Sequence, residues 1–144
     1  MSGIVGNNVG RGSGIIDPAG GGGKLLQAVS AEKNTIQTIS SSGGVDISGL
    51  SIDIVPQTDS DVLLWVCING SQQTANNLLG LTLLRGSTVI GEADTSGVSN
   101  MAASQSIGLF SAEHSQGASW QHLDLSPGGD GSTTITYKVQ AVVA

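Results

Sequence analysis

The sequence predicts an all-β protein, an antiparallel two-sheet sandwich or jelly roll with an extended glycine-rich N-terminal arm. Three observations support this prediction. The run Val62–Ile68 is apolar at every position and rich in β-branched residues, which favours a buried strand over a helix. Leu78–Glu92 has the pattern of a hairpin that turns at Arg85-Gly86-Ser87. Turn-forming residues also recur at regular intervals along the chain, as they do between the strands of a sandwich.

Three strands are expected before the apolar run. Leu25–Val29 and Thr35–Ser40 are short and carry aliphatic residues at strand spacing. Val45–Ile54 alternates apolar and polar residues, and the alternation slips at Ser48-Gly49, which indicates a β-bulge. Pro56 ends this strand, because proline cannot donate a hydrogen bond to a sheet.

The run Val62–Ile68 is the expected centre of the fold. A strand with one solvent face alternates polar and apolar residues, so an unbroken apolar run indicates that both faces are covered. We therefore expect a core strand at Leu64, Trp65, Val66, Cys67 and Ile68, with a neighbouring copy or a wrapped loop covering its second face. Trp65 is expected among the largest core side chains, and Cys67 is interpreted as a small buried hydrophobe and not a reactive thiol, because no basic residue adjoins it.

The second half of the chain contributes the hairpin and three more strands. Ser106–Ser111 and Ala118–Leu125 are expected to be strands, and Pro127–Gly131 forms the turn that follows them. Ser132–Val143 then alternates strictly, with Tyr137 among the residues of its apolar face. The total is eight or nine strands and no helix, which is typical of a single sandwich domain over residues 24–144.

The composition of the chain limits the classes of partner that we expect for it. Only 11% of residues are charged, the formal net charge is −6 and the calculated pI is about 4.4. A protein without a basic stripe is a poor binder of nucleic acid, so no nucleic-acid partner is expected. No apolar run approaches the ~18 residues of a membrane span and no secretory signal is recognisable, so we expect no membrane partner and synthesis in a host cytoplasm. Cys67 is the single cysteine, which excludes an internal disulfide.

Residues 1–23 hold nine of the 22 glycines, interrupted by aliphatic residues. Such a segment cannot offset its own ordering entropy, so one interpretation is a disordered leader. The alternative, which we favour, is an arm that lies extended on a partner. In this hypothesis Val9, Ile15 and Ile16 fill pockets and Arg11 meets an acidic groove, because a plain spacer has no use for paired isoleucines.

The sequence contains only weak matches to motifs for phosphate, metal or sugar binding. The glycine-rich stretch before Lys24 fails as a phosphate-binding loop, because Pro18 and Leu25 occupy two of its required positions. His122 and Asp124 can share a strand face and begin a metal site, but scattered histidines are more often surface residues. Trp120 is either a core or interface residue or a stacking platform for sugar. We therefore predict no enzyme, no catalytic residue, no metal site and no cofactor.

Three phrases of the sequence, GLSIDIVPQTDSDVLLWVCING, LTLLRGSTVIGEAD and TTITYKVQAVV, resemble small virion proteins of tailed bacteriophages, especially phages of cyanobacteria and marine bacteria. The resemblance spans roughly residues 24–143. It implies a β-sandwich protein that decorates the capsid as a cement protein, or one that sits on the tail or its fibres.

The first of these implications is the expected function. It is a structural protein on the outer capsid surface that binds the major capsid protein, bridges neighbouring capsid subunits and assembles as a homo-oligomer, a trimer by analogy. The alternative is a tail-associated module that binds glycan on the host surface.

Overall fold

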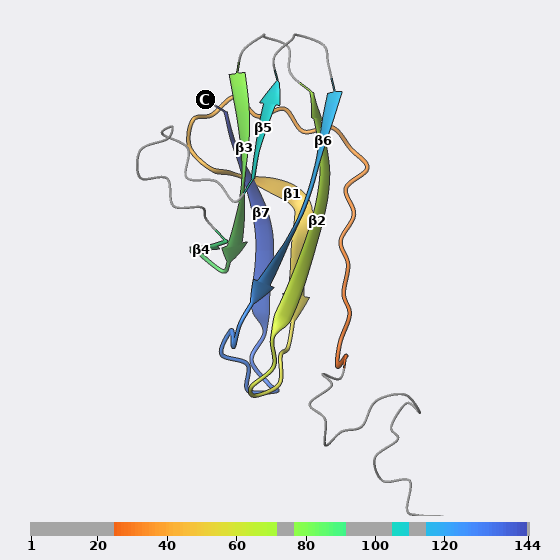
Figure 1. The fold of residues 1–144 in the computed structure, drawn as a ribbon, viewed down its shortest axis with the longest axis vertical. Coiled ribbons are helices and arrows are strands. Elements are labelled where there is room, and N and C mark those ends of the chain that lie inside the picture. Colours follow the sequence, from red (N-terminus) through yellow and green to blue (C-terminus); the bar gives the residue numbers. More distant parts are fainter. Residues whose placement is uncertain (1–24, 72–76, 92–104, 110–114, 144) are drawn as a thin grey trace, which may run out of the picture.

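The computed structural model describes residues 25–71, 77–91, 105–109 and 115–143, so the proposed arm at 1–23 lies outside the described residues. Within these ranges the chain is all-β and contains no helix (Figure 1). The strands, in chain order, are β1 (Val45–Ile54), β2 (Val62–Ser71), β3 (Asn77–Arg85), β4 (Thr88–Ile90), β5 (Gln105–Leu109), β6 (Ser115–Asp124) and β7 (Ile135–Val143).

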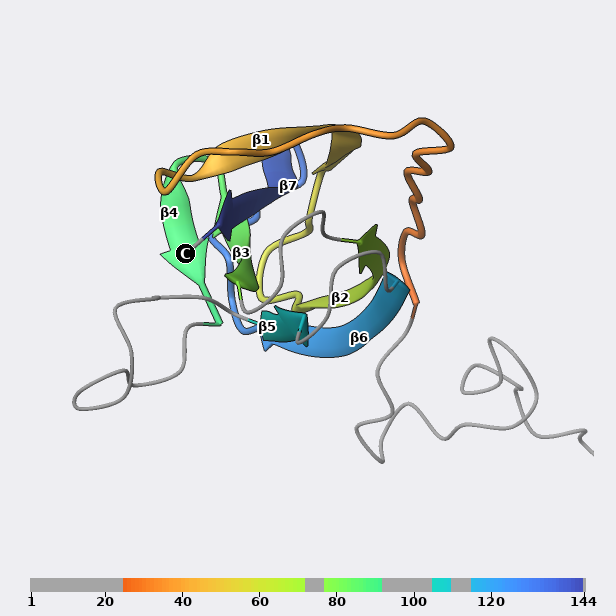
Figure 2. The ribbon, with the colours of Figure 1, turned by 90° about the horizontal axis from the view of Figure 1, so that it is seen from above.

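The strands form two antiparallel sheets. The larger sheet has the order β1-β7-β3-β4, with β5 also pairing with β3, and the smaller sheet consists of β2 and β6 alone. Viewed from above, β1 and β7 lie opposite β2 and β6 (Figure 2). The expectation of an all-β fold with antiparallel sheets is confirmed, and the arrangement is sandwich-like.

The core lies between the two sheets and is mainly aliphatic. Tyr137 and Leu81 are its largest fully buried side chains. Along β7, Tyr137, Val139 and Ala141 alternate with less buried residues, as the period-two pattern of the sequence predicted. Val62 and Leu64 of β2 close the core from the smaller sheet.

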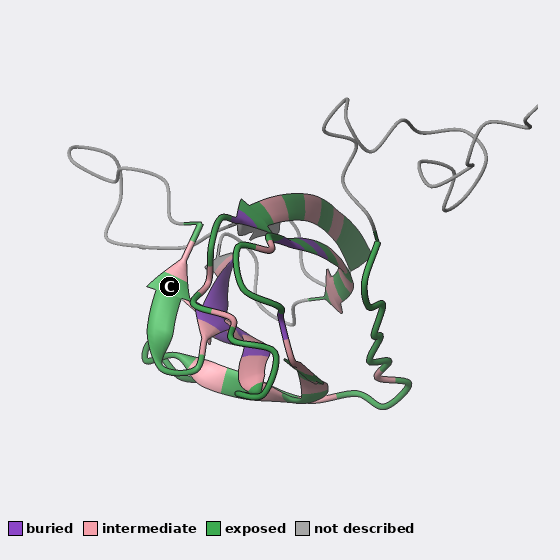
Figure 3. Ribbon diagram, turned by 90° about the horizontal axis from the view of Figure 1, so that it is seen from below, coloured by how far each residue is buried: buried purple, intermediate pink, exposed green. Residues whose placement is uncertain are grey.

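β2 differs from its prediction. Its burial alternates: Val62 and Leu64 are buried, whereas Leu63, Trp65 and Cys67 are exposed (Figure 3). The expectations that Trp65 is a core side chain and that Cys67 is buried are therefore wrong for this chain by itself. The physical reason is that, among the described residues, no second layer lies outside the β2–β6 sheet, so the outer face of the apolar run Val62–Ile68 remains open.

The strand that is buried on both faces is β3. Leu81 and Leu83 point into the core, and the alternate residues Thr82 and Leu84 are buried as well. The strand covered on both faces is thus one that Thr82 interrupts, whereas the unbroken apolar run Val62–Ile68 is covered on one face only.

Two local predictions are confirmed. The pairing of β1 with β7 shifts register between Asp46 and Ser51, which places a bulge at the expected position, and Gly49 there has φ of 86°. The hairpin of β3 and β4 turns at Gly86, which has φ of 60° and whose N–H donates to the carbonyl of Thr136 at 2.8 Å. A residue with a Cβ is strained at both positive-φ positions.

The predicted strands Leu25–Val29 and Thr35–Ser40 do not form, because within the described chain residues 25–40 make no backbone–backbone hydrogen bond to a neighbouring strand. This segment runs extended along β1 and is held by side chains. The Gln37 amide accepts from the N–H of Ser48 and donates to the carbonyl of Asp46, both at 2.9 Å, and the N–H of Val55 donates to Gln27. Glutamine amides here replace the backbone pairing that the sequence pattern predicted.

Candidate functional site

The most unusual surface of the molecule is the solvent side of the β2–β6 sheet. Here the register pairs Leu63 with Leu123, Trp65 with Gln121 and Cys67 with Ser119. We call these six residues the β2–β6 outer face. Trp65 is 70% exposed, Leu63 64% and Leu123 50%, and Leu125 just beyond β6 is 65% exposed. Large apolar side chains gathered on one face typically mark an interaction surface.

The polar atoms of this face are largely paired with each other. The indole N–H of Trp65 donates to the hydroxyl oxygen of Ser119 at 3.2 Å, and the same hydroxyl lies 3.2 Å from the Sγ atom of Cys67. Burying the face against a partner would therefore leave few of its polar groups without a hydrogen bond, which lowers the cost of desolvation.

The face also carries no formal charge. Residues 62–71 and 115–123 contain no Asp, Glu, Lys or Arg, although the chain as a whole has a net charge of −6. His122 is the one titratable imidazole in these two strands, and it lies on the inward side of β6, opposite Leu64. Docking at this face requires no buried ion pair.

A cavity of about 430 Å3 opens beside β2 and between the sheets. Its walls are mainly aliphatic. They come from β1, β2, β3, β7 and residues 29–31 of the leading segment, and the described residues that line them include Lys138 and Tyr137 but no carboxylate or histidine. Ligand pockets run from about 300 to 1,000 Å3, so the volume is sufficient for a small apolar group, but its walls lack a carboxylate pair for acid–base chemistry.

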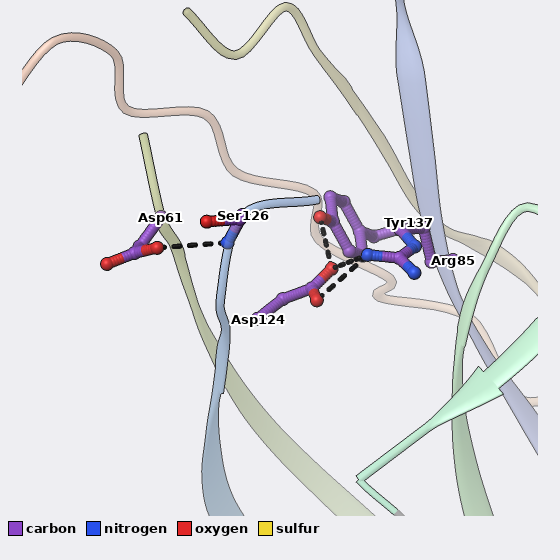
Figure 4. A network of polar contacts seen from close by, with 5 residues as sticks. All are labelled: Asp61, Arg85, Asp124, Ser126 and Tyr137. Carbon is purple, nitrogen blue, oxygen red and sulfur yellow. Dashed lines mark hydrogen bonds and ion pairs between the residues drawn. The ribbon is translucent and has the colours of Figure 1, made fainter. Parts of the chain in front are cut away.

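The strongest electrostatic cluster of the described residues lies at the end of β6 that is far from Cys67, and it joins the two sheets (Figure 4). The carboxylate of Asp124 accepts from Nη1 of Arg85, 3.0 Å from each carboxylate oxygen, and from the hydroxyl of Tyr137 at 2.7 Å. Nearby, Asp61 accepts the backbone N–H of Ser126 at 3.0 Å and fixes the chain as it leaves β6.

This cluster changes the titration of Tyr137. Burial of the phenol, and then its hydrogen bond to Asp124 and the charge of that carboxylate, raise the pKa of Tyr137 well above its usual range. The Asp124 carboxylate is occupied by two donors and is itself buried. The arrangement fastens the smaller sheet to the larger one, and we assign it a structural role.

The residues that the sequence suggested for metal binding or sugar binding lie outside the β2–β6 outer face. His122 and Asp124 share the inward face of β6, as expected, but the described residues contain no group of three His, Cys, Asp or Glu side chains that could hold a metal ion. Trp120 is half-buried against the core and its indole N–H is buried without a hydrogen-bond partner. The exposed indole is Trp65, so a stacking platform at Trp120 is not what the structure presents.

Comparison with protein-family models, with curated proteins and with solved structures finds no match for this chain. No helix among the described residues is long and apolar enough to cross a membrane. The candidate site therefore depends on geometry alone: an exposed, uncharged, apolar sheet face. Sequence analysis missed this face because it assigned Trp65 and Cys67 to the core. The available signal was that Leu63 and Trp65 in β2, and Leu123 in β6 with Leu125 just beyond it, recur at alternate positions.

Proposed function

We propose that this chain is a structural virion protein that decorates the outside of a phage capsid. In this proposal it binds the major capsid protein, bridges neighbouring capsid subunits and acts without catalysis or a cofactor. The observation that carries the proposal is the β2–β6 outer face, whose exposed leucines and tryptophan need a macromolecular partner to leave water.

Two further features support an assembly role. The low charge content of 11% reduces the desolvation cost of close contact between proteins. In addition, the described walls of the cavity offer no carboxylate pair or imidazole. Three phrases of the sequence resemble small virion proteins of phages, and this resemblance is the reason for proposing a phage capsid as the assembly.

The proposal gives residues 1–23 the role of the capsid anchor, with Val9, Ile15 and Ile16 as apolar contacts and Arg11 as the charged one. It also includes a jelly-roll chain path for residues 24–144. Leu25 lies two residues after the end of the proposed arm and is exposed, so an incoming arm can continue into the extended segment that lies along β1.

Decoration of capsids tests this function. The full chain is mixed with phage capsids from which the native surface protein has been stripped, and bound protein is measured by co-sedimentation. The proposal predicts saturable binding that the double variant Ile15→Ser, Ile16→Ser loses and that Ile36→Ser retains, since Ile36 is 98% exposed and lies outside both proposed contacts. Absence of any capsid binding by the parent protein would overturn the proposal.

A second candidate is a tail-associated module that binds host glycan, and the exposed indole of Trp65 favours it. A sugar site normally places unpaired hydrogen-bonding groups around such an aromatic ring. Here the indole N–H is already bound to Ser119 and the neighbouring Leu63 and Leu123 are apolar, which suits a dry protein contact better. A glycan array separates the two functions: saturable binding that Trp65→Ser abolishes would establish the second.

A further inference from the structure

We infer that the β2–β6 outer face binds a second copy of this same chain. The inference rests on the proposed function and deepens it, because it names the partner of the face. In this arrangement the outer faces of two copies pack on each other, so that each supplies the second layer that the other's two-stranded sheet lacks.

If two copies associate, charge favours this face over the rest of the surface. Two molecules that each carry a net charge of −6 repel one another over most of their surfaces. Strands β2 and β6 contain no Asp or Glu before Asp124, and Asp124 is buried and paired with Arg85. The outer face is thus a surface on which two identical acidic chains meet without placing like charges opposite each other.

The hydrogen bonding of the face suits a contact that excludes water. The indole N–H of Trp65 donates to the hydroxyl oxygen of Ser119, and that hydroxyl also lies 3.2 Å from Sγ of Cys67, so packing Trp65 against an apolar surface does not leave the indole N–H without an acceptor. Gln121, which is paired with Trp65 in the register, is the polar side chain that must find a partner across the contact.

Shape and position agree with this assignment. Leu63 and Leu123 form a cross-strand pair next to Trp65, so the tryptophan is flanked by aliphatic side chains as in the centre of a typical protein interface. Two sheets pack with their faces about 10 Å apart and their strands within about 30° of each other, which allows Trp65 of one copy to contact the leucines of the other.

Sedimentation equilibrium tests the inference on the full chain. The parent protein should sediment at twice the chain mass of 14.4 kDa at micromolar concentration. The variant Trp65→Ser, which replaces an exposed side chain, should weaken self-association about tenfold or more, and Leu63→Ser should act in the same direction. Ile36→Ser removes an even more exposed aliphatic side chain elsewhere and should leave the mass unchanged.

Three outcomes would overturn the inference: a parent mass of one chain, an oligomer that survives both face variants, or an oligomer that Ile36→Ser disrupts equally. A far-ultraviolet circular dichroism melt of each variant shows that it remains folded. The capsid assay separates this result from the proposed function. A protein that stays monomeric in solution but binds capsids through Trp65 would refute the second copy as the occupant and would support capsid decoration. An oligomer that the face variants disrupt but that binds no capsid would support the second copy and refute capsid decoration.

Discussion

Replacing Asp124 by alanine is expected to be among the most destabilising polar substitutions in this chain. Asp124 is buried and accepts hydrogen bonds from Arg85 and from Tyr137, which is 1% exposed. Losing the carboxylate leaves the phenol hydroxyl buried without an acceptor, which costs about 1–3 kcal/mol. It also leaves the guanidinium without its ion pair, and removing one partner of a buried pair costs about 3–5 kcal/mol.

The total is smaller than the sum of those terms. The side chain of Arg85 is 32% exposed, so water can solvate the abandoned guanidinium. We therefore expect Asp124→Ala to lower the free energy of unfolding by about 3 kcal/mol and Tyr137→Phe to lower it by about 1–2 kcal/mol. Because both substitutions remove the same hydrogen bond, the double variant should be more stable than additivity predicts.

Urea unfolding followed by circular dichroism measures these differences, with Asp53→Ala as the matched control. Asp53 is an exposed aspartate that accepts a hydrogen bond from Thr136 at the surface, so its loss should cost within about 0.5 kcal/mol. If Asp124→Ala costs no more than Asp53→Ala, or if the double variant is strictly additive, the cluster does not fasten the two sheets together.

The same cluster predicts a pH dependence. Tyr137 is the single tyrosine, and its pKa is raised in the folded state above the ordinary value of about 10. The unfolded chain therefore releases the phenol proton first as pH rises, so this contribution to stability is complete below about pH 10 and is lost progressively above it. The urea midpoint should fall above that pH in the parent more steeply than in Tyr137→Phe. Equal slopes would contradict the assigned pKa direction.

Three further comparisons test other parts of the fold by urea unfolding or limited proteolysis. Trp65→Ser should change the free energy of unfolding by less than about 1 kcal/mol, because the side chain is mostly exposed. Leu81→Ala in the core should lower it by about 2–5 kcal/mol. If the two variants lose similar amounts of stability, Trp65 is a core residue after all. Gly129→Ala should cost about 1–3 kcal/mol, because a Cβ there would meet the carbonyl oxygen of the Pro56 backbone at 2.5 Å. Gly43→Ala should be nearly neutral, because a Cβ there would make only an ordinary contact with Oγ of Ser41 at 3.5 Å. Gln37→Ala should speed proteolysis within residues 25–40 and leave the urea midpoint nearly unchanged, since its amide holds that segment to β1 by three hydrogen bonds; an unchanged cleavage rate would contradict this role.

The features that sequence predicted well are local. The bulge of β1, the hairpin turn at Gly86 and the alternation of β7 each follow from residues that are adjacent or two apart, because turn conformation and strand period are set at that range. Strand pairing depends on distant segments. Residues 25–29 have the composition of a strand, yet they pair with none of the strands β1 to β7 of the described residues.

The candidate site was not predictable for a related reason. An apolar run indicates that a strand can be covered on both faces, but it does not identify the segment or partner that covers it. In this chain the inward residues of β2 meet the core and Trp65 and Cys67 do not, so the pattern itself marks a face that is apolar and open. Asp124, Arg85 and Tyr137 likewise come together from three strands, and no spacing in the sequence relates them.

The central claim is that the β2–β6 outer face is covered when the protein is assembled, and the thiol of Cys67 reports on it directly. Cys67 is the single cysteine, is exposed in the isolated chain and lies two residues from Trp65 on that face. Its alkylation rate by iodoacetamide should be that of an accessible thiol at nanomolar protein concentration. The rate should fall as concentration rises and again on capsid-bound protein, and Trp65→Ser should restore it in solution. An alkylation rate that stays constant over all concentrations and on the capsid would contradict the account.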